Sequence, residues 1–211
     1  PNFRLPCDYI LGENFVFSSL RRDLDKLRYL SPVRATPQRA YIHYTNEVLD
    51  LREDGSNSAH VLWGNRNRMV YWKGEKIPLI KAINSCISCM GLNQSIKPSK
   101  TGNVMYQIKV SIPNNRNDVT IADVGFGYSQ IIPIVLMGLL NDKDNLMLIE
   151  QPEIHLHPSS SANLADLFLG FVQDGKRFVI ETHSQDLVNR LRLRIIENPQ
   201  LRDKINIVFV N

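Results

Sequence analysis

Three polar clusters in the second half of the chain carry residue types that suit phosphate and metal chemistry. The first, D-V-G-F-G-Y-S-Q at 123–130, leads into an apolar segment with helical character. The second, E-Q-P-E-I-H-L-H-P at 150–158, follows the apolar run at 146–149, and the third, E-T-H-S at 181–184, follows the apolar run at 178–180. Because open parallel sheets bind ligands at the carboxyl ends of their strands, these clusters are the candidate site.

Glu150 stands where a strand-end carboxylate can hold Mg²⁺, an ion that prefers oxygen ligands and keeps several of its waters. The alternative is a strand that simply ends at a solvated glutamate. Gly125, Gly127 and Ser129 precede a predicted helix, whose free amides and dipole favour phosphate, although most such glycine pairs only form turns. Taken alone, His183 would be assigned a structural role.

Two groups have a metal-binding alternative. Two histidines and two glutamates of the second cluster have the residue types of a transition-metal site: Glu150, Glu153, His155 and His157. Cys86 and Cys89 form a C-x-x-C, but no second pair of soft ligands lies nearby. We therefore interpret the cysteines as small buried residues of the apolar segment at 77–92.

The elements that must position these clusters follow from the hydrophobic pattern, which changes near residue 115. In the first part, residues 1–115, we expect a helix at 18–29, a polar surface loop at 52–67, a helix at 77–92, a half-buried strand at 104–112 and a turn at 114–118. In the second part, residues 116–211, we expect helices at 128–140, 158–171 and 184–197, and buried strands at 146–149, 178–180 and 205–210. Pro158 suits the first turn of its helix. Strands interleaved with helices predict parallel β-α-β units, and hence an α/β fold with a parallel sheet flanked by helices.

Composition excludes several classes of protein. The chain has 211 residues, 43% of them hydrophobic, and a formal net charge of +4, which is too mild to argue for nucleic acid. No apolar stretch approaches the roughly 20 residues of a membrane span, so we expect no membrane association. Three cysteines, an odd number, fit a reducing compartment, and we predict a cytoplasmic protein.

The three clusters, in this order, resemble the ABC/SMC-like AAA-type ATPases, and most of all a prophage and defence-associated group with D-V-G-F-G-x-S-Q, I-E-Q-P-E-I-H-L-H-P and E-T-H-S motifs. The segment Y-L-S-P-V-R at 29–34 is similar to the Y-L-G-P-L-R of that group. The resemblance implies ATP and Mg²⁺ as cofactors, and the C-terminal half of an ABC-type head that dimerises head-to-tail. It assigns Glu150 to Mg²⁺ and His183 to the switch that touches the γ-phosphate.

The same resemblance makes the first cluster the signature motif, which contacts the nucleotide of the opposite subunit through Gly125, Gly127, Ser129 and Gln130. It makes the region around His157 the D-loop that crosses the dimer interface, which we favour over the transition-metal reading.

The sequence departs from the pattern of the family at two places. No Walker A loop is present: the near match at 170–177 ends in Arg177 where a hydroxyl residue is needed, and it follows a helix and precedes a strand, so Gly175 is better explained as a helix terminator. We expect the loop upstream of Pro1. Gln151 stands where most ABC-type ATPases carry a glutamate, although the defence-associated group shares this glutamine. Because glutamine cannot accept a proton, slow hydrolysis is expected, with Gln151 and His183 positioning water and Glu153 carrying the negative charge beside it.

Three functions remain open from the sequence. The first is an ATPase head that dimerises on nucleotide and controls a partner, such as a nuclease in anti-phage defence. The second is an ATP-gated scaffold without turnover, and the third is a metal-dependent nuclease built on the second cluster. DNA is a further candidate partner because of Arg190, Arg192 and Arg194, but only Arg190 and Arg194 share a helix face, which favours a solvated surface.

Overall fold

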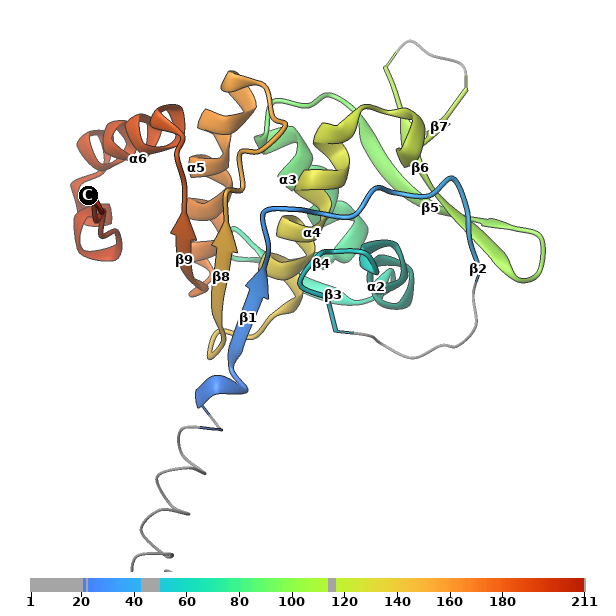
Figure 1. The fold of residues 1–211 in the computed structure, drawn as a ribbon, viewed down its shortest axis with the longest axis horizontal. Helices are drawn as coiled ribbons and strands as arrows, with labels where there is room; N and C mark the ends of the chain where they lie inside the picture. Colours follow the sequence, from blue (N-terminus) through green and yellow to red (C-terminus); the bar gives the residue numbers. More distant parts are fainter. Residues whose placement is uncertain (1–20, 22, 43–49, 114–116, 211) are drawn as a thin grey trace, which may run out of the picture.

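The computed structural model describes residues 21, 23–42, 50–113 and 117–210. A parallel sheet of three strands organises the part that carries the candidate site (Figure 1). Its order is β1 (Leu27–Leu30), β8 (Leu146–Glu150) and β9 (Arg177–Glu181), so β8 is central as predicted. Helices α4 (Phe126–Leu140) and α5 (Pro158–Gln173) follow the predicted ranges closely, and Pro158 stands in the first turn of α5. The α/β fold with a parallel sheet flanked by helices is confirmed.

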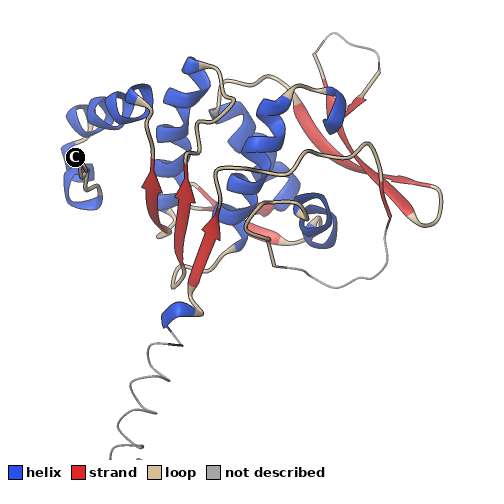
Figure 2. Cartoon of the chain, viewed as in Figure 1, coloured by secondary structure: helices blue, strands red, loops and turns tan. Residues whose placement is uncertain are grey.

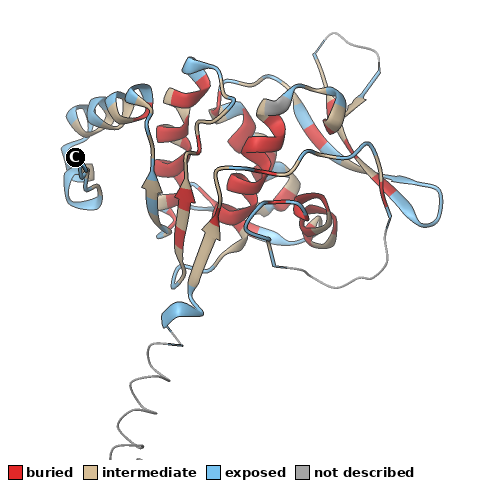
Figure 3. Cartoon of the chain, in the orientation of Figure 1, coloured by how far each residue is buried: buried red, intermediate tan, exposed pale blue. Residues whose placement is uncertain are grey.

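Helices cover one face of this sheet much more completely than the other. Figures 1 and 2 show α3 (Leu79–Cys89), α4 and α5 gathered on one side, with α6 (Gln185–Glu197) packed against α5. Met147 and Ile149 of β8 point to the covered side and are buried, whereas Leu148 is only half-buried. Val179 of β9 is 54% exposed. Figure 3 shows the same contrast between the buried helices and the outer strand. The expectation that β8 and β9 are covered on both faces is therefore wrong for the described residues.

A second, antiparallel sheet lies beside the first. Its order is β2 (Tyr41–Ile42), β6 (Met105–Ser111) and β5 (Ser95–Thr101), and β7 (Val119–Thr120) also pairs with β6. The predicted alternation of β6 is confirmed, since Tyr106, Ile108 and Val110 are buried. A separate hairpin joins β3 (Met69–Trp72) to β4 (Glu75–Pro78). Its turn residues Lys73 and Gly74 both have positive φ, which a tight hairpin turn of this kind requires.

Three predicted elements differ in the structure. The loop expected at 52–67 contains helix α2 (Ser58–Asn65), because Val61, Leu62 and Trp63 are buried in the core and the Trp63 ring stacks on Tyr106. The helix expected at 18–29 stops before strand β1, which pairs in parallel with β8; residues 18–20 lie outside the described part.

The strand expected at 205–210 does not form. This apolar segment has no strand partner among the described residues, and it follows a 3₁₀ helix, η2 (Pro199–Lys204), with Phe209 69% and Val210 93% exposed. A short 3₁₀ helix, η1 (Ile121–Asp123), also precedes α4. Of the predicted turn at 114–118, residues 114–116 lie outside the described part, as does Cys7. The division near residue 115 stays a prediction, although β1 joins the same sheet as β8.

Two other sequence interpretations hold only in part. Of the two cysteines predicted to be buried on α3, Cys86 is fully buried, and burial raises the pKa of its thiol, whereas Cys89 is half-buried. Arg190 and Arg194 do share a face of α6, but instead of facing solvent both bind Asp166 of α5, at 2.8 and 2.6 Å. Within the described ranges, no helix combines the length and apolar character that crossing a membrane demands.

Candidate functional site

Most of the predicted site residues lie at the carboxyl edge of the parallel sheet or in the N-terminal part of α4. The last paired positions of the two strands are Glu150 of β8 and Glu181 of β9, which lie opposite each other in the ladder. Both follow the apolar part of their strands, because the strand interiors pack on the helices while the ends reach solvent. The edge therefore presents acidic side chains where parallel sheets bind ligands.

Glu150 projects on the less covered face of the sheet, on the same side as Leu148 two residues before it. Tyr29 of β1 is opposite Leu148 in the register, so its phenol lies near the Glu150 carboxylate. Burial raises the pKa of Tyr29, and a hydrogen bond with the Glu150 carboxylate raises it further. The Tyr29 phenol was not identified from the sequence. The parallel pairing of β1 with β8 brings it close to Glu150.

The loop after β8 begins with a backbone in the left-handed region. Gln151 has a φ of 42°, which is uncommon for a residue with a side chain, and its amide donates to the carbonyl of Glu181 at 2.8 Å. Two turns follow, closed by the Ile154 amide on the Gln151 carbonyl and the Leu156 amide on the Glu153 carbonyl. The inter-strand bond holds Gln151 in this conformation, which residues at functional sites often adopt.

Glu153 ties this loop to the backbone of His183. Its Oε1 accepts the backbone amide of His183 at 2.8 Å. Its Oε2 is buried and has no hydrogen-bond partner among the described residues. In this structure Glu153 thus holds the backbone of the segment after β9, a role that its position in the sequence does not indicate.

The His183 side chain remains accessible. It is 79% exposed, and its Nε2 lies 3.3 Å from Glu181 Oε1. The next residue, Ser184, caps α6 by accepting the Leu187 amide at 3.2 Å, and its hydroxyl lies 2.6 Å from Ser161 of α5. The imidazole therefore stands on a fixed backbone with its ring free to contact a ligand in front of the strand ends.

The first cluster forms the start of α4. Gly125 is exposed at the N-cap and supplies no side chain to the first amides of the helix. A Cβ on Gly127 would lie 3.7 Å from Leu156, so this turn packs beside the loop after β8. Ser129 and Gln130, by contrast, are buried at 6% and 3% exposure. The helix therefore offers backbone amides at the surface, while these two side chains face the interior.

Arg34 is the functional candidate that the sequence did not single out. It follows β1, is 6% exposed, and donates through Nη1 to Gln130 Oε1 at 3.3 Å and through Nη2 to the Glu150 carbonyl at 3.1 Å. Burial lowers the pKa of its guanidinium to about 10, opposed by the nearby Glu153 carboxylate, so it stays charged at neutral pH. The only sequence signal was its place in the Y-L-S-P-V-R segment.

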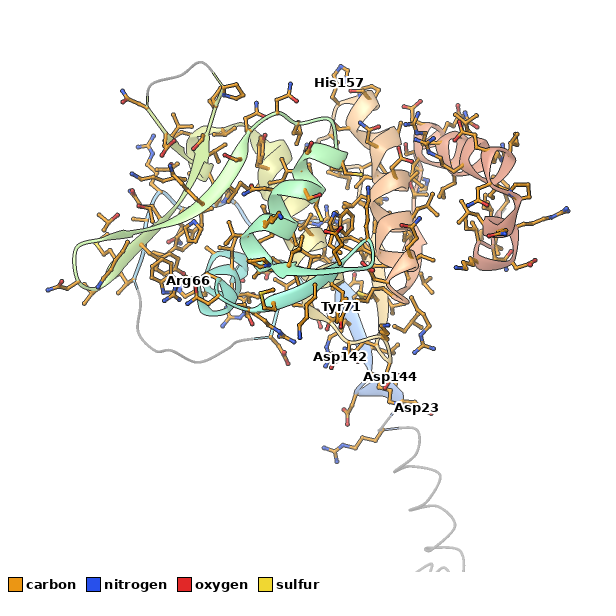
Figure 4. The ribbon with its side chains drawn as sticks, turned by 180° about the vertical axis from the view of Figure 1, so that it is seen from behind. Asp23, Arg66, Tyr71, Asp142, Asp144 and His157 are labelled. Atoms are coloured by element: carbon orange, nitrogen blue, oxygen red, sulfur yellow. The ribbon has the colours of Figure 1, made fainter. Side chains whose placement is uncertain are left out.

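His157 lies apart from this group. It is exposed at the N-terminus of α5, where its Nδ1 accepts the Ser159 amide at 3.3 Å and caps the helix (Figure 4). No group of three or more His, Cys, Asp or Glu side chains able to hold a metal exists among the described residues. The four residues of the predicted transition-metal site are therefore not brought together, and the metal-dependent nuclease built on them is not supported.

The two glycines of the segment at 170–177, the near match to a Walker A loop, are explained by the packing and the end of helix α5. Gly170 lies inside α5, where an added Cβ would be 2.5 Å from the Trp72 ring, and Gly175 follows the end of the helix with a φ of 81°. The interpretation of Gly175 as a helix terminator is confirmed.

The parallel sheet, its helices and the polar loops at its carboxyl edge define an α/β domain of the class that binds ligands at that edge. A family model described as an AAA ATPase domain matches residues 64–188, a range that contains all three polar clusters. This chain belongs to the AAA ATPase domain family.

Three solved structures align with the chain at 12% identity, each over 53% of its length. They are the Smc head bound to the C-winged helix domain of ScpA (36% of that chain, TM-score 0.43), the Smc head with an extended coiled coil bound to the C-terminal domain of ScpA from Pyrococcus furiosus (29%, 0.42), and the Smc head with a coiled coil and joint from Pyrococcus yayanosii (23%, 0.42). At these values the likeness supports no conclusion about function. The chain spans only 23–36% of those chains. No curated protein matches it.

Proposed function

We propose that this chain is the part of an ATP-hydrolysing head that supplies the Mg²⁺-binding carboxylate, the signature segment and the switch histidine. Two sets of contacts carry the proposal. Arg34 joins Gln130 of α4 to the carbonyl of Glu150, and His183 contacts Glu181 through its ring and Glu153 through its backbone amide. Together with membership of the AAA ATPase domain family, this arrangement suits a nucleotide whose phosphates lie in front of the strand ends.

The carboxylates fit a magnesium ion that is shared with a nucleotide. Mg²⁺ is usually held by one or two carboxylates, with waters and phosphate oxygens completing its shell, and it would neutralise phosphate charge. Glu150, which is half-buried at the end of β8 and steadied by Tyr29, would hold it. Because the described residues offer no larger acidic cluster, an all-protein metal cage does not fit.

The test is steady-state ATPase activity of the intact protein with and without Mg²⁺. Glu150→Gln should reduce turnover at least tenfold while the unfolding temperature stays near that of wild type. The matched control is Asp144→Asn, which changes an exposed carboxylate just before the opposite end of β8 (Figure 4). Equal activity of Glu150→Gln and the control would remove Glu150 from the site.

Self-association on nucleotide is the second part of the proposal. Gly125 is exposed and a Cβ there would meet no atom within 4 Å, so Gly125→Asp should be accommodated. The new carboxylate would stabilise the N-terminus of α4, but it would accept hydrogen bonds from the free amides there and repel a phosphate group. We expect normal stability and loss of ATP-dependent dimers in sedimentation, with Gly125→Ala as the control. Dimers that persist in Gly125→Asp would contradict a signature role.

An ATP-gated scaffold without turnover is the second candidate. It is favoured by Gln151, which cannot act as a base, and by the use of Glu153 Oε1 to hold the His183 amide. Gln151→Glu separates the two candidates: in a slow ATPase it should raise turnover or leave it level, whereas Glu153→Gln and His183→Ala should each lower it. No turnover in wild type or in Gln151→Glu, with partner and DNA present, would favour the ATP-gated scaffold.

The wider biological role follows from the sequence resemblance alone. We propose that nucleotide-dependent association of two heads controls a separate nuclease partner in anti-phage defence. Co-purification of a nuclease with the intact protein in the presence of ATP, but not with Glu150→Gln, is the expected result. A protein that associates and turns over ATP with no nuclease partner would exclude this role and leave the ATPase proposal intact.

A further inference from the structure

We infer that Arg34 is a positioning residue whose buried guanidinium holds the N-terminal part of α4 and the carboxyl end of β8 in one fixed arrangement. In this way it would set the geometry between the signature segment and the carboxylate and switch segments. The kinetic consequence rests on the proposed ATPase function, whereas the structural consequence does not.

The contacts of Arg34 join elements that are far apart in the sequence. The chain leaves β1 and passes α4 on its way to β2 (Figure 1). Arg34 lies on this connection and contacts both α4 and the end of β8. One nitrogen donates to Gln130, 96 residues away, and another to the carbonyl of Glu150, 116 residues away. A single rigid side chain thus spans two of the three polar clusters.

The charge of Arg34 reaches the third cluster through Glu153. Arg34 Nε and Glu153 Oε2 are both buried, and neither has a hydrogen-bond partner among the described residues. The Glu153 carboxylate is close enough to favour the charged form of Arg34. Since the other oxygen of Glu153 holds the His183 amide, loss of the guanidinium would leave the buried Oε2 of this carboxylate without a nearby positive charge, at the residue that anchors His183.

The geometry of the contacts favours arginine over lysine. The guanidinium is a planar fork whose nitrogens reach acceptors in different directions, whereas an ammonium group is a single point of charge. Arg34→Lys would keep the charge beside Glu153 but could not span both Gln130 and the Glu150 carbonyl in the same way. Arg34→Lys should therefore retain part of the turnover that Arg34→Met loses.

The experiment compares Arg34→Met, Arg34→Lys and a control, Arg39→Met, in the intact protein. Arg39 lies in the same segment but its side chain is 78% exposed, and it binds Asp123 at the surface. We would measure three properties of each variant: the affinity for a fluorescent ATP analogue in the presence of Mg²⁺, the steady-state kcat and KM, and the temperature of thermal unfolding. A displacement of about 1 Å at a catalytic site can reduce turnover ~100-fold.

We expect kcat to fall about 10- to 100-fold in Arg34→Met with less than about threefold change in nucleotide affinity, partial recovery in Arg34→Lys, and no change in Arg39→Met. Wild-type kcat in Arg34→Met would overturn the inference. So would a decrease in activity that only follows the loss of folded protein, with no recovery in Arg34→Lys. If Arg34→Met does not fold, Arg34→Lys decides alone, because it must fold and still show a reduced kcat.

Hydrogen exchange separates failure of this inference from failure of the proposed ATPase function. If the wild-type protein neither binds nor hydrolyses ATP, the proposed function is wrong whatever Arg34 does. Arg34 is then judged on amide protection at the start of α4 and in the loop at 151–157. Both should lose protection together in Arg34→Met but not in Arg39→Met. Loss at only one of the two segments, or at neither, would refute the coupling.

Discussion

Gly170→Ala tests whether the glycine of the near match at 170–177 is there for packing. An added Cβ would lie 2.5 Å from Cη2 and 2.8 Å from Cζ3 of Trp72. Carbon atoms normally approach to about 3.5–4.0 Å, so the ring would have to move by about 1 Å. Trp72 cannot move freely, because it is 3% exposed, its Nε1 donates to Ser85 Oγ at 2.9 Å, and its ring packs edge-on against Phe171.

Two opposing effects set the magnitude. Replacing a helix-interior glycine by alanine favours the folded state by about 1 kcal/mol. Overpacking a close-packed core costs about 1–3 kcal/mol, and an overlap with a fixed aromatic ring belongs at the upper end of that range. The net loss should be about 1–2 kcal/mol. For a chain of this size, that corresponds to a decrease of about 2–8 °C in the unfolding temperature.

Thermal unfolding followed by circular dichroism measures this change. The matched control is Gly127→Ala in α4, where the new Cβ would meet Leu156 at an ordinary 3.7 Å, so no loss of stability is expected. Nucleotide affinity per folded molecule should stay unchanged in Gly170→Ala. A variant as stable as wild type would refute the packing argument, and a specific loss of ATP binding would show that the near match contacts phosphate after all.

Substitutions at three other positions test contacts that hold α5, α6 and the β3–β4 turn in place. Asp166→Asn should lower stability by about 1–3 kcal/mol at pH 7, because the carboxylate accepts hydrogen bonds from two arginines of α6. Burial acts to raise the pKa of Asp166, but the two arginines lower it overall. The stabilisation is therefore present at neutral pH and should vanish as the pH falls below about 4. Urea unfolding of wild type and Asp166→Asn at several pH values checks this. Asp174→Ala should cost about 1–3 kcal/mol in urea unfolding, since the buried carboxylate accepts the two amides of the β3–β4 turn at 2.8 and 2.7 Å. Ser184→Ala should cost about 1 kcal/mol and increase hydrogen exchange in the first turn of α6, whereas Ser184→Asn should preserve both.

The elements of the second half were predictable because their signals are local. Apolar runs of three or four residues and a proline at the start of α5 act within one or two turns of chain. The failure at 205–210 has the same origin: an apolar run favours a strand, but a strand also needs a partner strand, and this segment pairs with none of the described strands. Strand β1 was missed for the converse reason, since its pairing with β8 outweighs a helical spacing of leucines.

The sequence by itself determined which residue types gather at the carboxyl ends of β8 and β9, because the alternation of strands and helices fixes where a parallel sheet presents its loops. Only the tertiary structure decided what each side chain does there. Glu153 holds the His183 backbone, His157 caps a helix, and Arg34 bridges two clusters. Arg34 meets its partners across 96 and 116 residues of sequence. No local periodicity reports such contacts, because they exist only once the core has packed and excluded water from the charges that it encloses.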